Sequence, residues 1–138
     1  NVLQTLSDFK EKGRLITLFW ACGDRDKSNR PKMGSIVSKY SDMVILTQDD
    51  DYSEKPEDII KDVIPGINRK EGEGFWVVLD RTEAIRTALV MAKKDDLILI
   101  AGKWDEHIRV TNDGPVEWHD KTLVLKMLSD IEDNVIVK

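Results

Sequence analysis

The sequence predicts an α/β fold in which helices cover both faces of a mostly parallel sheet. Short apolar runs rich in β-branched residues alternate with segments of helical periodicity, and the connections between them are short. These runs are continuous rather than alternating with polar residues, as expected for strands that are buried on both faces. The pattern therefore favours a parallel sheet over a sandwich of antiparallel strands.

Each element is predicted from its own residues. Apolar runs predict strands at residues 14–21, 42–47, 75–80 and 96–102, and helical spacing predicts helices at residues 1–12, 31–40, 56–64, 80–94 and 120–131. The sequence "HIRVTNDGPVEWH" predicts an antiparallel hairpin that turns around Asn112 to Pro115. The result is a Rossmann-like three-layer sandwich with a C-terminal hairpin, and we expect residues 1–138 to form a single domain.

Several helix ends are predicted by capping residues. Gly13 is placed for a left-handed cap after the first helix. Pro65 and Gly66 are expected to stop the third helix. Asp80 is expected to cap the fourth helix, with Glu83 three residues further on as its reciprocal partner.

Bulk composition excludes several classes of function. The 138 residues carry a net charge of −5 without a basic run, which argues against a partner that is nucleic acid or an anionic membrane. No apolar stretch approaches the length of a membrane span, and Cys22 is the single cysteine. We therefore expect a cytoplasmic monomer without disulfides. Because the first residue is not Met, the chain is also read as a piece of something longer.

Three loops should lie at one edge of the sheet, because ligands of parallel sheets bind at the carboxyl ends of the strands. The loop at residues 20–30 offers Arg25 as a guanidinium fork for a carboxylate or phosphate. The residues expected to support that loop are Asp24, Asp26 and Arg30. The alternative is a solvated turn whose charges neutralise one another and whose polar residues cap the next helix.

The loop at residues 48–55 places Asp49, Asp50 and Asp51 together, followed by Tyr52. Such a triplet suits an ammonium group or a divalent ion, although its spacing is not that of a calcium-binding loop. The alternative is a solvated acidic turn. We predict no metal site.

The loop at residues 102–107 combines Gly102 with Lys103 and Glu106, which suit an anion and an ammonium group respectively. His107 and His119 are interpreted as structural, and Cys22 as a buried thiol without a base. No glycine-rich phosphate loop occurs in the sequence, and we predict no catalytic residue within this chain.

Taken together, the three loops resemble one family. "GDRDKSNRPKMG" is similar to the G-G-D-R-D-x-x-K-R-P-x-M-G signature of the Mur ligases, and "TQDDDYSEKP" to their T-x-D-N-P-R-x-E-x-P segment. "DRTEAIRTA" and "AGKWDE" resemble D-R-x-x-A-I-x-x-A and A-G-K-G-H-E. The resemblance is to the carboxy-terminal domain, with the UDP-N-acetylmuramoyl-tripeptide synthetases as the most similar type.

This resemblance implies an ATP-dependent amide ligase of peptidoglycan assembly, with UDP-muramoyl-dipeptide and an incoming amino acid as substrates. ATP and Mg²⁺ would bind mostly outside this chain, so the isolated domain would hold no cofactor and be inactive. Arg25 would bind the carboxylate of the amino acid, and Gly102 and Glu106 would face its far ammonium. Asp50 stands for the Asn of D-N-P-R and Tyr52 for its Arg, which favours L-lysine over diaminopimelate.

The chain also departs from the family pattern. Trp20, Cys22 and Trp104 stand where the family has glycine, so an indole would obstruct the pocket or form an aromatic wall. The strand that normally opens the domain is missing, and the apolar tail "NVIVK" is a candidate to pair in its place. The alternative function is therefore a non-catalytic binding or interaction module, or an engineered scaffold.

Overall fold

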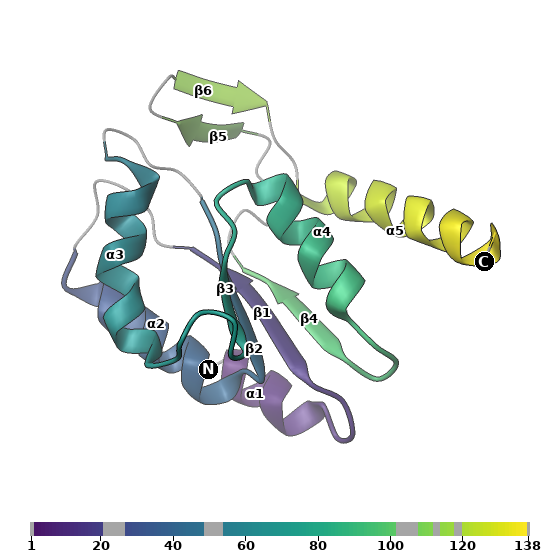
Figure 1. Ribbon diagram of the computed structural model, residues 1–138, viewed down its shortest axis with the longest axis horizontal. Coiled ribbons are helices and arrows are strands. Elements are labelled where there is room, and N and C mark those ends of the chain that lie inside the picture. Colours follow the sequence, from purple (N-terminus) through teal and green to yellow (C-terminus); the bar gives the residue numbers. More distant parts are fainter. Residues whose placement is uncertain are drawn as a thin grey trace.

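A computed structural model describes residues 2–20, 27–48, 54–101, 108–111, 114–117 and 120–137. The elements are α1 (Val2–Phe9), β1 (Leu15–Phe19), α2 (Asn29–Tyr40), β2 (Met43–Leu46), α3 (Pro56–Ile67), β3 (Phe75–Val77), α4 (Arg81–Met91), β4 (Leu97–Ile100), β5 (Ile108–Thr111), β6 (Gly114–Glu117) and α5 (Asp120–Val137). Figure 1 shows strands and helices alternating up to β4, followed by the hairpin and the closing helix. The predicted α/β class is confirmed.

The four strands β1 to β4 form one parallel sheet in the order β3-β2-β1-β4. β1 lies inside the sheet, and all five of its residues are buried, which is why its sequence is a continuous apolar run. β5 and β6 pair antiparallel in a separate sheet, so the predicted hairpin is also confirmed.

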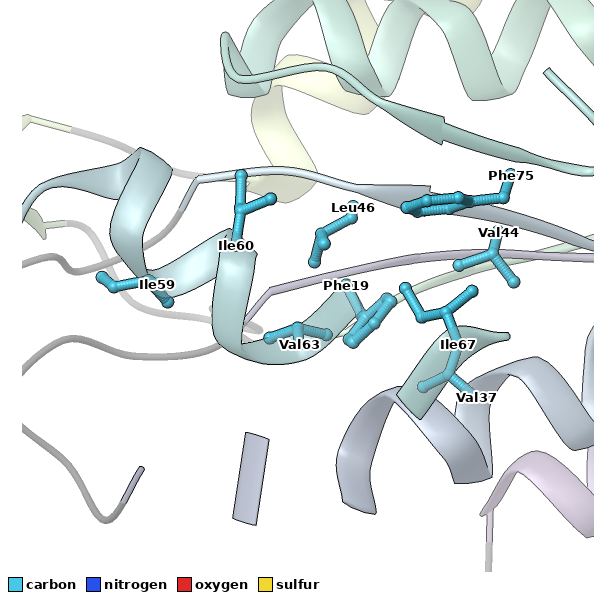
Figure 2. Packing of buried hydrophobic residues seen from close by; sticks show 9 residues of the cluster. All are labelled: Phe19, Val37, Val44, Leu46, Ile59, Ile60, Val63, Ile67 and Phe75. Carbon is cyan, nitrogen blue, oxygen red and sulfur yellow. The ribbon is translucent and has the colours of Figure 1, made fainter. Parts of the chain in front are cut away.

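Two apolar clusters cover the two faces of the sheet. Phe19 packs with side chains of α2 and α3 in one cluster, which Figure 2 shows closely interdigitated around Leu46 and Val63. Leu18 points to the other face, where it packs with side chains of α4 and with Met127 of α5. Alternation along β1 thus builds a core on each side, and the three-layer arrangement follows.

The helix α3 is longer than the sequence predicts. It continues through Pro65 and Gly66 to Ile67, and Asn68 then adopts a left-handed conformation with φ of 54°. Pro65 lies in the last turn, where its missing N–H costs the helix one backbone hydrogen bond but α3 has only two more residues to run. Gly66 has a packing role instead, because a Cβ atom there would lie 1.7 Å from the carbonyl oxygen of Pro31 in α2.

Gly13 also acts through close approach rather than through a left-handed cap. The first helix already ends at Phe9, and the positive φ of 41° belongs to Glu11. A Cβ on Gly13 would lie 1.8 Å from the carbonyl oxygen of Asp95, in the turn before β4. The glycine therefore lets the entries to two paired strands come together.

Partly buried hydrogen bonds join the elements at the amino edge of the sheet. The carboxylate of Asp96, whose side chain is 3% exposed, accepts bonds from the backbone N–H of Arg14 at 2.9 Å and from its Nη2 at 2.7 Å. Hydrogen bonding to Arg14, and also to the backbone N–H of Lys93, holds the pKa of Asp96 well below its usual range.

A second arginine, Arg69, joins α2 to the same edge of the sheet. The guanidinium of Arg69 donates to the backbone carbonyls of Ser38, Asp42 and Gly74, among others, at 2.8–3.1 Å. Its flat array of donors therefore binds the end of α2 to the entry of β3.

Two predictions concern the ends of the last helices. Asp80 caps α4 by accepting a hydrogen bond from the backbone N–H of Glu83 at 3.0 Å, as predicted. The tail prediction was wrong, because residues 134–137 continue α5 rather than forming a strand. In Figure 1, α5 runs outward from the sheet towards the C-terminus.

We predict that Gly66→Ala destabilises the fold by about 3 kcal/mol, because the added methyl group has to push α3 away from the backbone of α2. The neighbouring exposed change Pro65→Ala is the control, and it should leave stability unchanged or raised, because it restores a helical N–H. Urea unfolding followed by circular dichroism measures both. Equal stability of Gly66→Ala and the parent chain would contradict the close contact.

A second prediction concerns acid. The folded pKa of Asp96 is depressed, so its stabilising contribution is present above the unfolded pKa of about 4 and is lost as the pH falls below it. Asp96→Asn should therefore lower the melting temperature at about pH 7 and have a shrinking effect at lower pH. Thermal unfolding of the parent chain and of Asp96→Asn, from about pH 7 to below about pH 4, measures the difference in melting temperature. A difference that does not vary with pH would contradict the lowered pKa of Asp96.

Candidate functional site

The carboxyl edge of the sheet brings together the starts of all three predicted loops. β1 lies between β2 and β4, with Phe19 paired to Leu46 and Leu18 to Ile100. One residue beyond, the backbone N–H of Thr47 bonds to the carbonyl of Phe19 at 3.0 Å, and that of Ala101 to the carbonyl of Leu18 at 3.0 Å. Three neighbouring strands therefore open into the three charged segments at one edge.

Most of the predicted binding residues lie outside the described residues. These are Asp24, Arg25, Asp26, Asp49, Asp50, Tyr52, Gly102, Lys103 and Glu106, together with Cys22 and Trp104. Their roles stay predictions. The structure describes the residues on which these loops begin and end, and among them is Arg30, predicted as a loop support.

Arg30 connects the ends of the first two loops. It lies in the first turn of α2, is 2% exposed, and its Nη2 donates to Oε2 of Glu54 at 2.6 Å. Its Nη1 donates to Oδ2 of Asp62 on α3 at 2.8 Å, and Lys27 reaches the other oxygen of Glu54 at 3.2 Å. Lys27 and Arg30 lie near the end of the first loop and Glu54 near the end of the second, so these ion pairs hold the two loop ends together.

The electrostatics of this cluster explain how a buried cation is tolerated at a helix N-terminus. The positive end of the helix dipole disfavours Arg30 there, and the first turn of α2 contains no acidic residue. Hydrogen bonds to Glu54 and then to Asp62 outweigh burial and raise the pKa of Arg30. The guanidinium is therefore charged at every physiological pH and acts as a permanent crosslink.

A second buried arginine lies at the start of the same loops. Arg81, the first residue of α4, is 1% exposed, and its Cζ lies 3.9 Å from the centroid of the Trp20 ring. Its Nη1 also donates to the backbone carbonyl of Gln48 at 3.4 Å. Trp20 is the first residue of the first loop and Gln48 is the first residue of the second.

This packing changes the interpretation of Trp20. The indole is 9% exposed and packs with Leu18 and Met127 in the core cluster on the α4 and α5 face. Trp20 is therefore part of the core rather than an exposed aromatic wall. It supports the guanidinium of Arg81 from the side of the core.

Sequence reasoning assigned no role to Arg81, Glu54 or Asp62. A signal for Arg81 was present, because a cation directly after a capping Asp lies at the unfavourable end of the helix dipole. Such a residue needs a compensating partner, and here it has the face of Trp20. The partners of Arg30 carry no such signal, since they are distant in sequence and meet it only through the packing of α2 on α3.

Within the part of the chain that the structure describes, every helix is too short or too polar to span a membrane. Within the same part of the chain, no three His, Cys, Asp or Glu side chains are grouped so that they could hold a metal ion.

The fold and this edge define a class of protein. A parallel sheet with helices on both faces, whose neighbouring strands open into charged loops at their carboxyl ends, is an α/β domain built to bind a small molecule there. The profile of the family described as "Mur ligase, glutamate ligase domain" matches residues 1–104. The chain belongs to the Mur ligase family and corresponds to its C-terminal domain.

Similar proteins agree with this assignment. The chain is 44% identical over 129 residues to the UDP-N-acetylmuramoyl-L-alanyl-D-glutamate–2,6-diaminopimelate ligase of Clostridioides difficile, a match that covers 94% of the chain and 26% of that ligase. It is 42% identical over 130 residues to ligase 1 of the same name from Clostridium acetobutylicum, with the same coverage.

A solved structure of a UDP-N-acetylmuramoyl-L-alanyl-D-glutamate–2,6-diaminopimelate ligase superposes with a TM-score of 0.84 at 28% identity. The superposition covers 94% of this chain and 27% of that one. The chain thus spans about a quarter of the length of the curated relatives it matches.

We predict that Arg30→Met lowers the free energy of unfolding by on the order of 2 kcal/mol, because it removes charged hydrogen bonds from a buried position. Lys27→Met is the matched control. Its side chain is 68% exposed, so its ion pair with the same Glu54 should contribute less than about 0.5 kcal/mol. Chemical denaturation of both variants measures the difference, and equal losses would contradict the crosslinking role of Arg30.

Proposed function

We propose that this chain is the amino-acid-binding domain of an ATP-dependent ligase that adds an amino acid to UDP-N-acetylmuramoyl-dipeptide. The observation that carries the proposal is the convergence of β2, β1 and β4, whose adjacent ends open into the three segments bearing the family motifs. The domain holds the amino acid so that its amine meets an activated carboxyl group supplied by the rest of the ligase. Such positioning accounts for a large part of the rate enhancement in bimolecular reactions.

Roles within the proposed site follow from the charge of each group. Arg25 binds the carboxylate of the amino acid through its guanidinium fork. Asp49 and Asp50 receive a distal ammonium group together with Glu106, while Lys103 and Gly102 line the same loop cluster. Asp24 and Asp26 orient Arg25.

ATP and Mg²⁺ belong to this proposal as cofactors of the full-length ligase. ATP supplies the phosphoryl group that activates the dipeptide carboxylate, and phosphate leaves when the amine attacks. This chain contains no glycine-rich phosphate loop, so the residues that hold the nucleotide are assigned mostly to the remainder of the ligase.

The incoming amino acid is proposed to be a diamino acid, with L-lysine as the expected substrate. The relatives are named for 2,6-diaminopimelate, which carries a second carboxylate beside its distal ammonium. In this chain Tyr52 stands where the family motif has arginine, and it is flanked by Asp49, Asp50 and Asp51. An acidic loop without that guanidinium favours a side chain that ends in ammonium alone.

Calorimetry on the chain itself distinguishes the candidates. Titration with L-lysine, diaminopimelate and ATP should give heat for L-lysine. Heat for diaminopimelate alone would assign the substrate of the relatives instead. No heat with any of the three would favour the non-catalytic binding module. The burial of the Trp20 indole removes one of the features that pointed to such a module.

A kinetic prediction tests Arg25 in the full-length ligase. Arg25→Ala should raise the KM of the amino acid by at least about tenfold, because the carboxylate loses a bidentate partner, and should leave the KM of ATP within about twofold. The control is Arg86→Ala, an exposed arginine of α4 that pairs with Glu83 on the same helix. An unchanged KM for the amino acid in Arg25→Ala would overturn the role assigned to Arg25.

A further inference from the structure

We propose that Arg81 is a positioning residue for the incoming amino acid, acting through the starts of the first two loops. This inference rests on the proposed function and adds to it a residue that lies beneath the binding groups. Arg81 is buried, so it does not itself touch the substrate. It acts on Trp20 and Gln48, from which the two loops depart.

Arg81 contacts two residues at once that follow different strands. Its guanidinium lies against the Trp20 ring after β1 and donates to the Gln48 carbonyl after β2. Its backbone is fixed in turn, because Asp80 caps α4 and Thr47 donates its hydroxyl to the carbonyl of Leu79 at 3.3 Å. The starts of both loops are thereby attached to the N-terminus of α4.

The loops are also fixed where they end. Lys27 and Arg30 hold the end of the first loop to Glu54 at the end of the second. Each loop is consequently bound to the other at both of its ends, by Arg81 at the start and by Arg30 at the end. The proposed binding groups of these two loops, Arg25, Asp49, Asp50 and Tyr52, lie between these anchors in the sequence.

The contacts of position 81 depend on the shape of the guanidinium group. A lysine at position 81 retains the charge but has no planar face to lie on an indole, and it reaches a carbonyl through a single point. A misplacement of about 1 Å in a binding group costs up to about 100-fold in rate. Replacing Arg81 should therefore affect binding of the amino acid more than it affects the fold.

The test uses the full-length ligase with Arg81→Met and Arg81→Lys. Arg81→Met should raise the KM of the amino acid by at least about tenfold, while the KM values of ATP and UDP-muramoyl-dipeptide stay within about twofold. Arg81→Lys should give a smaller rise in the same direction. The milder variant keeps the test informative if Arg81→Met does not fold.

Arg69→Met is the matched control. Arg69 also binds backbone carbonyls through its guanidinium, but at the amino edge of the sheet. It should lower the melting temperature without raising the KM of the amino acid. Equal KM effects of the Arg69 and Arg81 variants at equal loss of stability would overturn the proposal, because Arg81 would then be merely structural.

A double-substitution cycle tests whether Arg81 acts through Trp20. If it does, Trp20→Leu should raise the same KM, and the combined variant should show less than the product of the two single effects. Independent effects would overturn this route. If Arg25→Ala impairs binding of the amino acid and the Arg81 variants do not, only the inference about Arg81 is wrong. If the full-length ligase binds no amino acid, the proposed function itself is wrong.

Discussion

The structure depends on the parallel pairing of β1 with β2 on one side and β4 on the other. Because β1 is buried along its whole length, a shift of its register by one residue would exchange the side chains that face the two cores and disrupt the packing of both. The same pairing places Phe19, Leu46 and Ile100 near one another at the ends of three strands. One set of backbone hydrogen bonds therefore supports both the core and the candidate binding edge.

Four arginines organise the two edges of this sheet, and each uses the flat guanidinium differently. At the amino edge, Arg14 pairs with Asp96, and Arg69 binds the carbonyls of turns and helix ends. At the carboxyl edge, Arg30 is neutralised by two carboxylates, whereas Arg81 lies on an aromatic ring. A lysine has neither the planarity nor the number of donors for these positions.

The sequence alone predicted the order of elements and the layer arrangement, because continuous apolar runs and helical spacing report burial directly. It also predicted the cap at Asp80, whose hydrogen bond is local. The predictions for Gly13 and Gly66 were wrong, because both glycines lie where the backbone of a distant segment comes very close. The tail at residues 134–137 has the apolar, β-branched composition of a strand, but it continues the helix α5, which begins at Asp120.

The candidate site was predictable only in outline. Its place at the carboxyl edge follows from a rule about parallel sheets, and the starts of the loops obey it. Arg30 was expected as a support, but its partners Glu54 and Asp62 are set by how α2 packs on α3. Such pairings depend on tertiary geometry that no local pattern contains.

The contact between Gly66 and the Pro31 carbonyl has one more consequence. Because backbone meets backbone at this point, no side chain can give way there, and the contact fixes how closely α2 and α3 approach. The first two loops, whose far ends lead into these helices, are therefore attached to a support whose two parts keep one spacing.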